Sequence, residues 1–396
     1  MTTTKNNEHK KLNVPNLRFK EFQGEWEKSK LSDLCTFFSG GTPSSSNKDF
    51  YGGDIAFIRS GELHANSTEL FITQDGYDNS SAKKVEIGDL LLAMYGATSG
   101  DIAVSKIRGA INQAILCIRT NQNKKFIESV WNKHVSKILR KYLQGGQGNL
   151  SADIVKGISF SFPTLEEQER IANLISLLDE RIATQNKIIE DLKKLKSTII
   201  EEYYRQTEKN EVCVADLGNH FNVGNLAKDD LSETGKPCII YGELFTTYGE
   251  IISQIESHTN KTGGMILSKK GDLLFPSSTT VDAVSLIAPS VINVDNVILG
   301  GDMFGIHISH NYNAQYLSYY FNHIAKKQLA KFAKGSTIIH LHYTDIEKAK
   351  LLLPSLEEQN RMAKCLVALD KKVSVEQNLL SSLTCQKSYL LQQMFI

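Results

Sequence analysis

Apolar residues recur along two long segments of the chain, with spacings that alternate between four and three residues. The first stripe runs from Ile171 to Tyr203 and the second from Met362 to Met394, and matching positions lie 191 residues apart. This spacing is typical of a coiled-coil seam, in which one face of a helix packs on a partner helix. The predicted seam consists of Ile171, Ile175, Leu178, Ile182, Ile189, Leu192, Met362, Leu366, Leu369, Val373, Leu380 and Leu383.

Both segments open with the same short motif, which predicts where each helix begins. Residues 163–168 read Pro-Thr-Leu-Glu-Glu-Gln and residues 354–359 read Pro-Ser-Leu-Glu-Glu-Gln. A hydroxyl residue followed three positions later by glutamate predicts a capping box. After that first proline, neither segment contains Gly or Pro (residues 164–206 and 355–396), so each helix should extend over roughly 60 Å. Because a lone helix would leave its apolar stripe in water, we expect an antiparallel pair and an approximate two-fold symmetry.

Four polar residues interrupt the stripes at equivalent places in the two copies, namely Gln185, Lys196, Glu376 and Lys387. A polar residue in a seam can fix the register of the two helices at a cost in stability. Alternatively, these positions face a partner subunit. The sequence leaves both interpretations open.

The segments before each long helix alternate short apolar runs with turns rich in Gly, Ser and Asn. These runs predict strands near residues 54–59, 90–93 and 114–119 and, in the second copy, near 239–241, 273–275 and 304–308. A closing helix is expected at 126–143 and again at 314–333. The fold class predicted is α+β: two globular α/β units separated by two long helices that form an antiparallel coiled coil, with a pseudo-two-fold internal repeat. The predicted segments are a polar tail at 1–14, a globular unit at 15–162, a helix and linker at 163–210, a second unit at 211–353 and a second helix at 354–396.

The charge of the chain is almost balanced, at +1, whereas nucleic-acid binders often carry a basic excess. Residues 1–162 are basic and residues 211–353 slightly acidic, with no arginine in the latter. Each predicted closing helix nevertheless ends in a basic cluster followed by a glycine-containing polar loop. Such clusters usually form a solvated helix end, but their duplication favours phosphate contacts. The phosphate-contacting candidates are Lys137, Arg140, Lys141, Lys327, Lys331 and Lys334.

The chemistry of a catalyst is not apparent in the sequence. The six cysteines form no Cys-x-x-Cys pair, the histidines have no metal-binding spacing, and no phosphate-binding loop or nucleophile elbow occurs. We therefore expect no catalytic residue and no metal site. No apolar run is long enough for a membrane helix and no signal peptide is apparent, so we expect a cytoplasmic protein without a membrane partner.

The duplicated motif, together with the residues around it, resembles the specificity subunit of type I restriction-modification systems. Further motifs that fit are the turn at residues 40–44, the run Leu-Leu-Ala-Met-Tyr-Gly-Ala-Thr at 91–98 and the run Gly-Ala-Ile-Asn-Gln-Ala at 109–114. The resemblance extends over essentially the whole chain after the N-terminal tail. The second unit departs from the first where residues 276–279 replace 95–98, which puts its target in doubt.

The resemblance implies a non-catalytic subunit with two target-recognition domains, each of which reads one half of a bipartite, asymmetric site in double-stranded DNA. It also implies two methyltransferase subunits docked on the helices, which methylate adenine, and motor-nuclease restriction subunits. This chain would hold no cofactor, while S-adenosylmethionine, ATP and Mg would belong to those partners. The small charge excess further predicts weak DNA binding by the chain alone. The alternative hypothesis is a helical-hairpin adaptor that joins proteins and never binds DNA.

Candidate base-reading residues are polar side chains in the turns of the two units, since such groups can donate to or accept from base edges. In the first unit they are Arg59, Ser60, Tyr95, Lys106, Gln147 and Asn149, and in the second Tyr241, Thr279, Thr337 and His340. Arg59 could equally be a salt-bridged strand residue, and the candidates of the second unit could be turn or packing residues.

Overall fold

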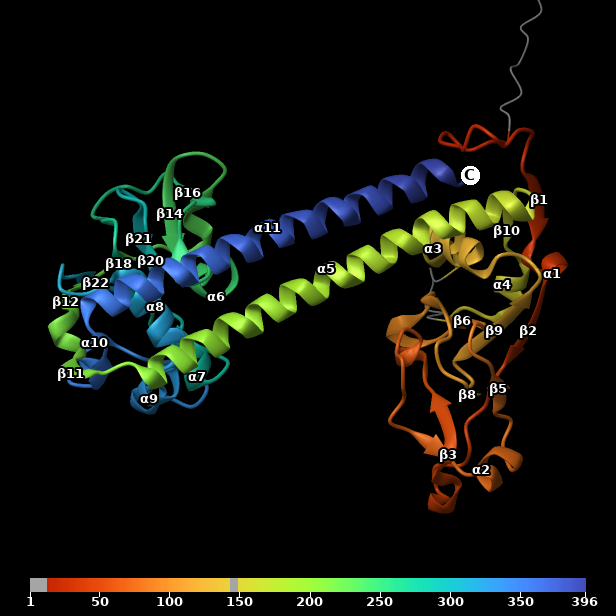
Figure 1. Ribbon diagram of the computed structural model, residues 1–396, viewed down its shortest axis with the longest axis horizontal. Coiled ribbons are helices and arrows are strands. Elements are labelled where there is room, and N and C mark those ends of the chain that lie inside the picture. The colour runs from red at the N-terminus through yellow and green to blue at the C-terminus, as the bar shows by residue number, and fades with distance from the viewer. Residues whose placement is uncertain (1–12, 143–148) are drawn as a thin grey trace, which may run out of the picture. The chain divides into compact units, whose positions relative to one another are not determined.

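The chain divides into two units, each of which includes part of both long helices. The computed structural model describes residues 13–142 and 149–396, and its elements are labelled in Figure 1. Unit 1 comprises Met1–Asn186 and Asn378–Ile396, and unit 2 comprises Lys187–Gln377. Both boundaries fall inside a helix, one in α5 (Leu165–Gln206) and one in α11 (Leu356–Met394).

Unit 1 contains two four-stranded sheets, in the orders β2-β9-β6-β7 and β4-β3-β8-β5, and the short pair β1-β10. The bounds of its strands are β1 Glu27–Lys30, β2 Cys35–Ser39, β3 Tyr51–Ile58, β4 Phe71–Ile72, β5 Lys83–Val85, β6 Leu90–Ala93, β7 Ile102–Val104, β8 Gly109–Ile111, β9 Ile115–Thr120 and β10 Ser159–Phe162. Its helices besides α5 and α11 are α1 Leu31–Leu34, α2 Gln74–Asp78, α3 Lys124–Tyr142 and α4 Ala152–Gly157, with 3-10 turns at Lys48–Phe50, Ser60–Glu62 and Gly96–Thr98.

Unit 2 contains two five-stranded sheets, in the orders β12-β22-β18-β20-β15 and β13-β16-β14-β21-β17, and the pairs β11-β24 and β19-β23. Its strands are β11 Asn210–Cys213, β12 Gly218–Asn222, β13 Leu231–Ser232, β14 Lys236–Ile240, β15 Ile251–Ile252, β16 Ser257–Thr259, β17 Ile266–Leu267, β18 Asp272–Pro276, β19 Ser278–Thr279, β20 Ser290–Ile292, β21 Ile298–Gly300, β22 Met303–Ile308, β23 Ile339–His340 and β24 Lys350–Leu353. Its helices are α6 Glu243–Thr246, α7 Ala283–Leu286, α8 Ala314–His323, α9 Lys326–Leu329 and α10 Tyr343–Ile346, with 3-10 turns at Val214–Leu217, Lys228–Asp230 and Ala330–Phe332.

The two units share one strand plan. The order β2-β9-β6-β7 of unit 1 corresponds to β12-β22-β18-β20 of unit 2, and β3-β8-β5 corresponds to β14-β21-β17. In each second sheet the inner pair is parallel, β3 with β8 and β14 with β21. The predicted α+β class and the internal repeat are therefore confirmed. The five predicted segment boundaries stay a prediction, because the units of the structure take in parts of both long helices.

The predicted coiled coil is confirmed, and every apolar residue assigned to its seam is buried or half-buried. In unit 1, Lys387 Nζ lies 2.5 Å from Asp179 Oδ1, and in unit 2, Lys196 Nζ lies 2.9 Å from Asp370 Oδ1. From the first ion pair to the second, the residue number on α5 increases from 179 to 196, while that on α11 decreases by the same amount, from 387 to 370. The two helices therefore run antiparallel. These ion pairs support the register interpretation of the two seam lysines.

The other two polar seam residues are also enclosed, because Gln185 is 5% and Glu376 8% exposed. Glu376 forms an ion pair with Lys372, one turn earlier on the same helix. Apolar side chains alone would not distinguish one register of the two helices from another. These two residues and the two lysines place polar groups at defined positions of the seam, which can fix the register.

The repeated Gln of the opening motif joins each long helix to the closing helix of its unit. Gln168 accepts a hydrogen bond of 3.1 Å from the backbone N–H of Asn123, and Gln359 accepts one of 3.0 Å from that of Asn313. Asn123 and Asn313 cap α3 and α8 through their own side chains. Each Gln also donates 2.9 Å to the carbonyl of the motif proline, at Pro163 or Pro354. The motif therefore fixes two helix starts at once.

The predicted capping boxes are confirmed only in their first half. The Thr164 and Ser355 hydroxyls accept from the backbone N–H of Glu167 and Glu358, as expected of an N-cap. The glutamate side chains bind elsewhere. Glu167 is 1% exposed and receives bonds from Arg18 and Trp26, while Glu358 pairs with Tyr203 and Arg361. A buried carboxylate takes charge-assisted partners from the tertiary structure in preference to a local backbone donor.

The predicted helix at 314–333 is wrong in its second half, because the chain leaves the α-helix after His323. It continues as the short helix α9 and the 3-10 turn at Ala330–Phe332. The break lies where His323 Nε2 approaches Glu250 Oε1 at 2.8 Å. Beyond it, Ala325 and Leu329 are buried in the core of the unit. A tertiary hydrogen bond and core packing thus override a segment without Gly or Pro.

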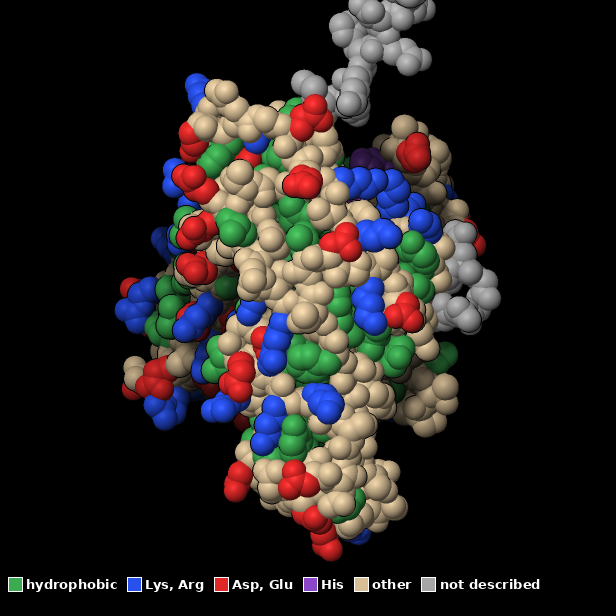
Figure 2. Space-filling model, turned by 90° about the vertical axis from the view of Figure 1, so that its right-hand side faces the viewer, with side chains coloured by type: hydrophobic (Ala, Val, Ile, Leu, Met, Phe, Trp, Pro, Cys, Tyr) green, Lys and Arg blue, Asp and Glu red, His purple; other side chains and the backbone are tan. Residues whose placement is uncertain are grey.

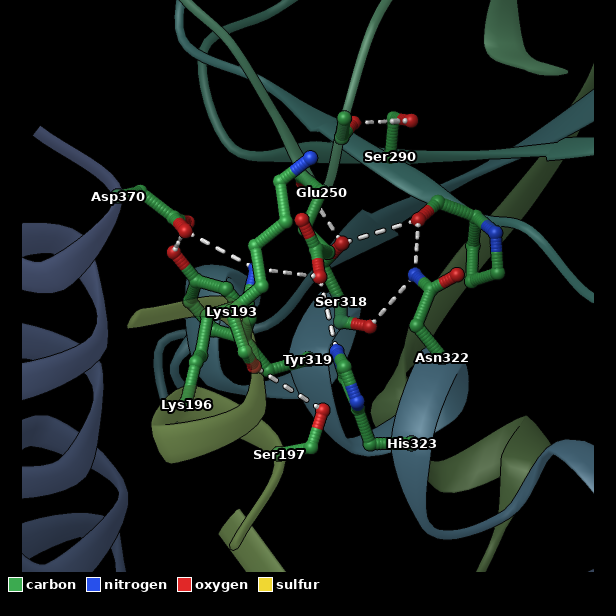
Figure 3. A network of polar contacts seen from close by, with 12 residues as sticks. Lys193, Lys196, Ser197, Glu250, Ser290, Ser318, Tyr319, Asn322, His323 and Asp370 are labelled. Atoms are coloured by element: carbon green, nitrogen blue, oxygen red, sulfur yellow. Dashed lines mark hydrogen bonds and ion pairs between the residues drawn. The ribbon is translucent and has the colours of Figure 1, made fainter. Parts of the chain in front are cut away.

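A polar network anchors both long helices to the body of unit 2 (Figure 3). Lys196 of α5 lies 2.9 Å from Glu250 Oε1 as well as from Asp370. Asp370 of α11 also accepts a hydrogen bond from the Tyr319 hydroxyl of α8. Four elements therefore converge on one lysine, whose side chain is only 12% exposed.

The pKa of Glu250 falls from 4.5 to about 2 in this network. Burial by itself raises the pKa, but the hydrogen bond with His323 and the charge of Lys196 outweigh that effect. Since the folded pKa lies below the unfolded one, ionised Glu250 stabilises unit 2 above about pH 4.5. We expect this stabilisation to disappear as the pH falls from about 4.5 through about 2.

Denaturant unfolding followed by far-UV circular dichroism at several pH values in this window measures the effect. The Glu250→Gln variant cannot titrate at this position and should show a flatter pH dependence. Equal slopes for the variant and the parent chain would contradict this role for Glu250.

Candidate nucleic-acid interface

In unit 1, three turns that carry base-reading candidates lie close together. His64 Nε2, just beyond the turn of Arg59 and Ser60, lies 2.9 Å from Asp101 Oδ1, just beyond the turn of Tyr95. The hydrogen bond with Asp101 raises the pKa of His64, and the nearby charge of Lys106 lowers it in part. Arg59 and Tyr95 are exposed, so both side chains are accessible to a ligand.

The other candidates of unit 1 are less well placed. The Arg59 guanidinium forms an ion pair of 2.9 Å with Glu62, which matches the salt-bridged alternative. Because the side chain of Arg59 is 52% exposed, DNA could compete for the arginine at little cost. Asn149 is exposed. Gln147 lies outside the residues that the structure describes.

In unit 2, three of the four base-reading candidates line one cleft. Tyr241, Thr279 and His340 are all on the wall of a cavity of about 800 Å3. Antiparallel pairing of β19 with β23 places Ser278 opposite His340 and Thr279 opposite Ile339. The fourth candidate, Thr337, is exposed on the turn that precedes β23.

The same cleft contains two charged side chains that are not among the base-reading or phosphate-contacting candidates, Asp302 and Lys326. Asp302 lies in the turn between β21 and β22, and Lys326 begins α9. Three exposed apolar residues, Phe245, Val281 and Ile338, also line it. A single aspartate in a turn does not indicate a binding site in the sequence, because aspartate is common in turns, where its side chain can bond to the nearby backbone.

The basic cluster of unit 1 lies on the second half of α3. Lys137, Arg140 and Lys141 are exposed, and no acidic side chain pairs with them among the described residues. Lys137 and Lys141 line a second cavity, of about 510 Å3, together with Lys28 and His134. Figure 2 shows Lys and Arg side chains gathered on part of the surface of unit 1. These residues are available for phosphate oxygens.

In unit 2 the basic candidates follow the cleft residue Lys326 along the chain. Lys327 and Lys331 are exposed on α9 and the 3-10 turn after it. Lys334 is also exposed but forms an ion pair with Asp345, so its charge is partly balanced. The described surface of unit 2 thus has a mixed polar and apolar cleft and, on the elements after Lys326, exposed lysines.

The described residues also bear on metal binding and on membrane insertion. Within residues 13–142 and 149–396, no group of three or more His, Cys, Asp or Glu side chains is arranged to hold a metal ion. Over the same residues, no helix has the length together with the apolar character that spanning a bilayer requires.

Known proteins share sequence with both units of this chain. The family model described as type I restriction modification DNA specificity domain matches residues 23–194 and again residues 207–384. The specificity subunit of the type I restriction enzyme MjaVIII from Methanocaldococcus jannaschii is 22% identical over 396 residues, which cover 90% of each chain. That of EcoR124I/EcoR124II from Escherichia coli is 28% identical over 187 residues, 44% of this chain and 45% of that one.

Solved structures agree in fold. The S subunit of the type I restriction-modification system from M. genitalium aligns with a TM-score of 0.63 at 16% identity, over 97% of this chain and 99% of that one. A chain from a study of complex assembly and conformational transition in the type I R-M system aligns with a TM-score of 0.56, at 16% identity, over 93% and 97% of the two chains. Since the matches to the family model take in most of both units, this chain belongs to the family of type I restriction modification DNA specificity domains.

Proposed function

We propose that this chain is the sequence-specific DNA-recognition subunit of a type I restriction-modification complex. Each unit reads one half of a bipartite, asymmetric site in double-stranded DNA, and the complex then methylates adenine or cleaves. The observation that carries the proposal is that the units share one strand plan but expose different side chains at corresponding turns. The turn after β3 carries Arg59 and Ser60, where the turn after β14 carries Tyr241, and the turn that begins with Tyr95 corresponds to the run that begins with Pro276. Different side chains on one framework suit two different half-sites.

In this proposal, catalysis belongs to partner subunits. Two methyltransferase subunits bind the outer faces of the long helices, and motor-nuclease subunits join them. Apolar side chains outside the seam support a docking surface, because Leu177, Ile188 and Leu195 on α5 and Val375 and Leu379 on α11 are exposed. S-adenosylmethionine, ATP and Mg bind to those partner subunits. The adaptor alternative is not favoured, because the family is defined by DNA specificity.

A binding experiment with the full complex tests the proposal. The chain, assembled with the methyltransferase subunits of its own system, should select a two-part sequence from a randomised double-stranded DNA library. Without those subunits, binding should be weak because the chain has a net charge of only +1. Selection of no sequence by the assembled complex would contradict the proposed function.

Removal of the basic candidates should weaken binding without changing the selected sequence. In the variant Lys137→Ala/Arg140→Ala/Lys141→Ala, the slope of log affinity against log salt should become shallower by about 0.9 for each phosphate that is no longer neutralised. The same is expected of Lys327→Ala/Lys331→Ala in unit 2. Titrations of the selected duplex at several salt concentrations measure the slope.

A matched variant removes three exposed lysines that lie outside these clusters, Lys20, Lys83 and Lys348. Its salt dependence should equal that of the parent chain. A new target sequence for either cluster variant would show that these residues read bases and would contradict their assignment to phosphates.

A further inference from the structure

The carboxylate of Asp302 has no bonded partner among the described residues. By contrast, Asp230, Asp272 and Asp295 of unit 2 each accept a hydrogen bond from a backbone N–H. Within the described part of the chain, no donor bonds to the Asp302 carboxylate, and no ion pair joins it to Lys326 in the same cleft. A carboxylate that does not stabilise its own turn is available for a ligand.

The backbone around Asp302 is nevertheless firmly held. Gly301 adopts φ +90°, where an L side chain is strained, and its N–H donates 3.0 Å to the carbonyl of Gly224. The carbonyl of Asp302 accepts a 2.7 Å hydrogen bond from the N–H of Ser277. A Cβ on Gly301 would meet the Tyr241 ring at 3.1 Å. Backbone hydrogen bonds therefore hold this turn beside Tyr241, and the carboxylate of Asp302 takes no part in them.

The corresponding turn of unit 1 carries a different polar group. The turn between β21 and β22 corresponds to the turn between β8 and β9. In unit 2, β21 pairs in parallel with β14, and in unit 1, β8 pairs in parallel with β3. The strands after them, β22 and β9, pair antiparallel with β18 and β6. The exposed Gln113 lies in the unit 1 turn, and its Oε1 accepts from the Thr42 hydroxyl. An amide both donates and accepts, whereas a carboxylate only accepts.

We propose that Asp302 determines which base unit 2 accepts at one position of its half-site, by accepting a hydrogen bond from an exocyclic amino group. This inference rests on the proposed function. A carboxylate repels DNA phosphates, so its presence in a DNA-binding cleft is favourable only where it meets a donor such as cytosine N4 or adenine N6. Opposite thymine O4 or guanine O6, two acceptors would face each other. Asp302 therefore selects as much by exclusion as by attraction.

The neighbouring groups fit a base edge and its backbone. Lys326, across the cleft, can donate to a guanine or to a phosphate. Phe245, Val281 and Ile338 are exposed at 37%, 73% and 49% and can cover a thymine methyl group or an unstacked base step. The exposed Lys327 directly follows Lys326 along the chain and is available for a phosphate. One cleft thus offers an acceptor, a donor and apolar contacts to a DNA groove.

The test uses the full chain with its methyltransferase subunits and a randomised double-stranded DNA library. For Asp302→Asn and Asp302→Ala we expect a change confined to one position of one half-site, where the preference for the parent base falls by about tenfold or more. The other half-site should be selected as before. Glu233→Gln is the matched control, since it neutralises an exposed acid of unit 2 outside the cleft and should leave selection unchanged.

The outcomes separate the inference from the function on which it rests. An unchanged target for both Asp302 variants would overturn the role of Asp302 while the proposed function stands. Uniform loss of binding to every sequence by Asp302→Asn, with an unchanged melting temperature, would also overturn it. If the parent complex selects no sequence, the proposed function itself fails, and the inference fails with it.

Discussion

Replacement of Phe395 by alanine should lower the free energy of unfolding of unit 1 by about 3–5 kcal/mol. The residue is 2% exposed, and its ring centroid lies 5.1 Å from that of Phe126 on α3. Its backbone carbonyl also accepts a 2.5 Å hydrogen bond from Lys133. Alanine would leave a cavity between α11 and the core that contains Trp26, where little can move in to fill it.

Tryptophan fluorescence makes this expectation specific to one unit. The sequence contains two tryptophans, and both Trp26 and Trp131 are buried in the core of unit 1. The Phe395→Ala variant should shift the denaturant midpoint seen by fluorescence, while circular dichroism should retain a transition of unit 2.

The matched control is Tyr204→Ala, at the repeat-equivalent position on α5. Tyr204 is only half-buried, with its ring 5.6 Å from Tyr320, so the loss should be smaller. The denaturant midpoint seen by tryptophan fluorescence should also be unchanged in Tyr204→Ala. An unshifted fluorescence midpoint for Phe395→Ala would contradict the role of this residue in the core of unit 1.

Replacement of Lys196 by methionine should destabilise unit 2 by about 2–3 kcal/mol. Methionine keeps the apolar stem but leaves Glu250 and Asp370 close together without their shared cation. The estimate lies below the usual cost of breaking a buried pair because the two carboxylates are 18% and 31% exposed. Circular dichroism should report the loss, and tryptophan fluorescence should not.

Lys387→Met provides the control at the equivalent place in unit 1. Lys387 is 30% exposed, and its partner Asp179 keeps a second cation at 2.8 Å, Lys125. The cost should therefore be at most about 1 kcal/mol. The double variant Lys196→Met/Asp370→Asn should recover part of the stability, because it removes one of the unpaired charges. Additive losses in the double variant would contradict a shared ion-pair network.

Local sequence patterns predicted the parts of the structure that depend on local physics. The seam and the N-caps followed from the spacing of apolar residues and from the residues before Leu165 and Leu356. The end of α8 did not follow, because His323 meets Glu250 across 73 residues of sequence. The repeated motif was found, but the role of its Gln in capping the closing helix depends on a contact with Asn123 or Asn313.

The candidate site was predictable in kind but not in detail. The pairing of β19 with β23 brings Thr279 and His340 into one cleft, and Tyr241 lines the same cleft from the turn after β14. Asp302 was missed because its environment is created by strands that are distant in sequence. A comparison of the two halves, turn by turn, would have placed it against the Gln113 turn of unit 1.

The division of each long helix between two units also determines the order in which the chain can fold during synthesis. Unit 2 is continuous, whereas unit 1 requires residues 378–396, including the buried Met394 and Phe395. At about 5–20 residues per second, roughly ten to forty seconds pass on the ribosome between the two parts of unit 1. During that interval the core around Trp26 and Phe126 lacks its last apolar cover. The segment translated first therefore finishes folding last, and we expect the nascent chain to depend on chaperones mainly through unit 1.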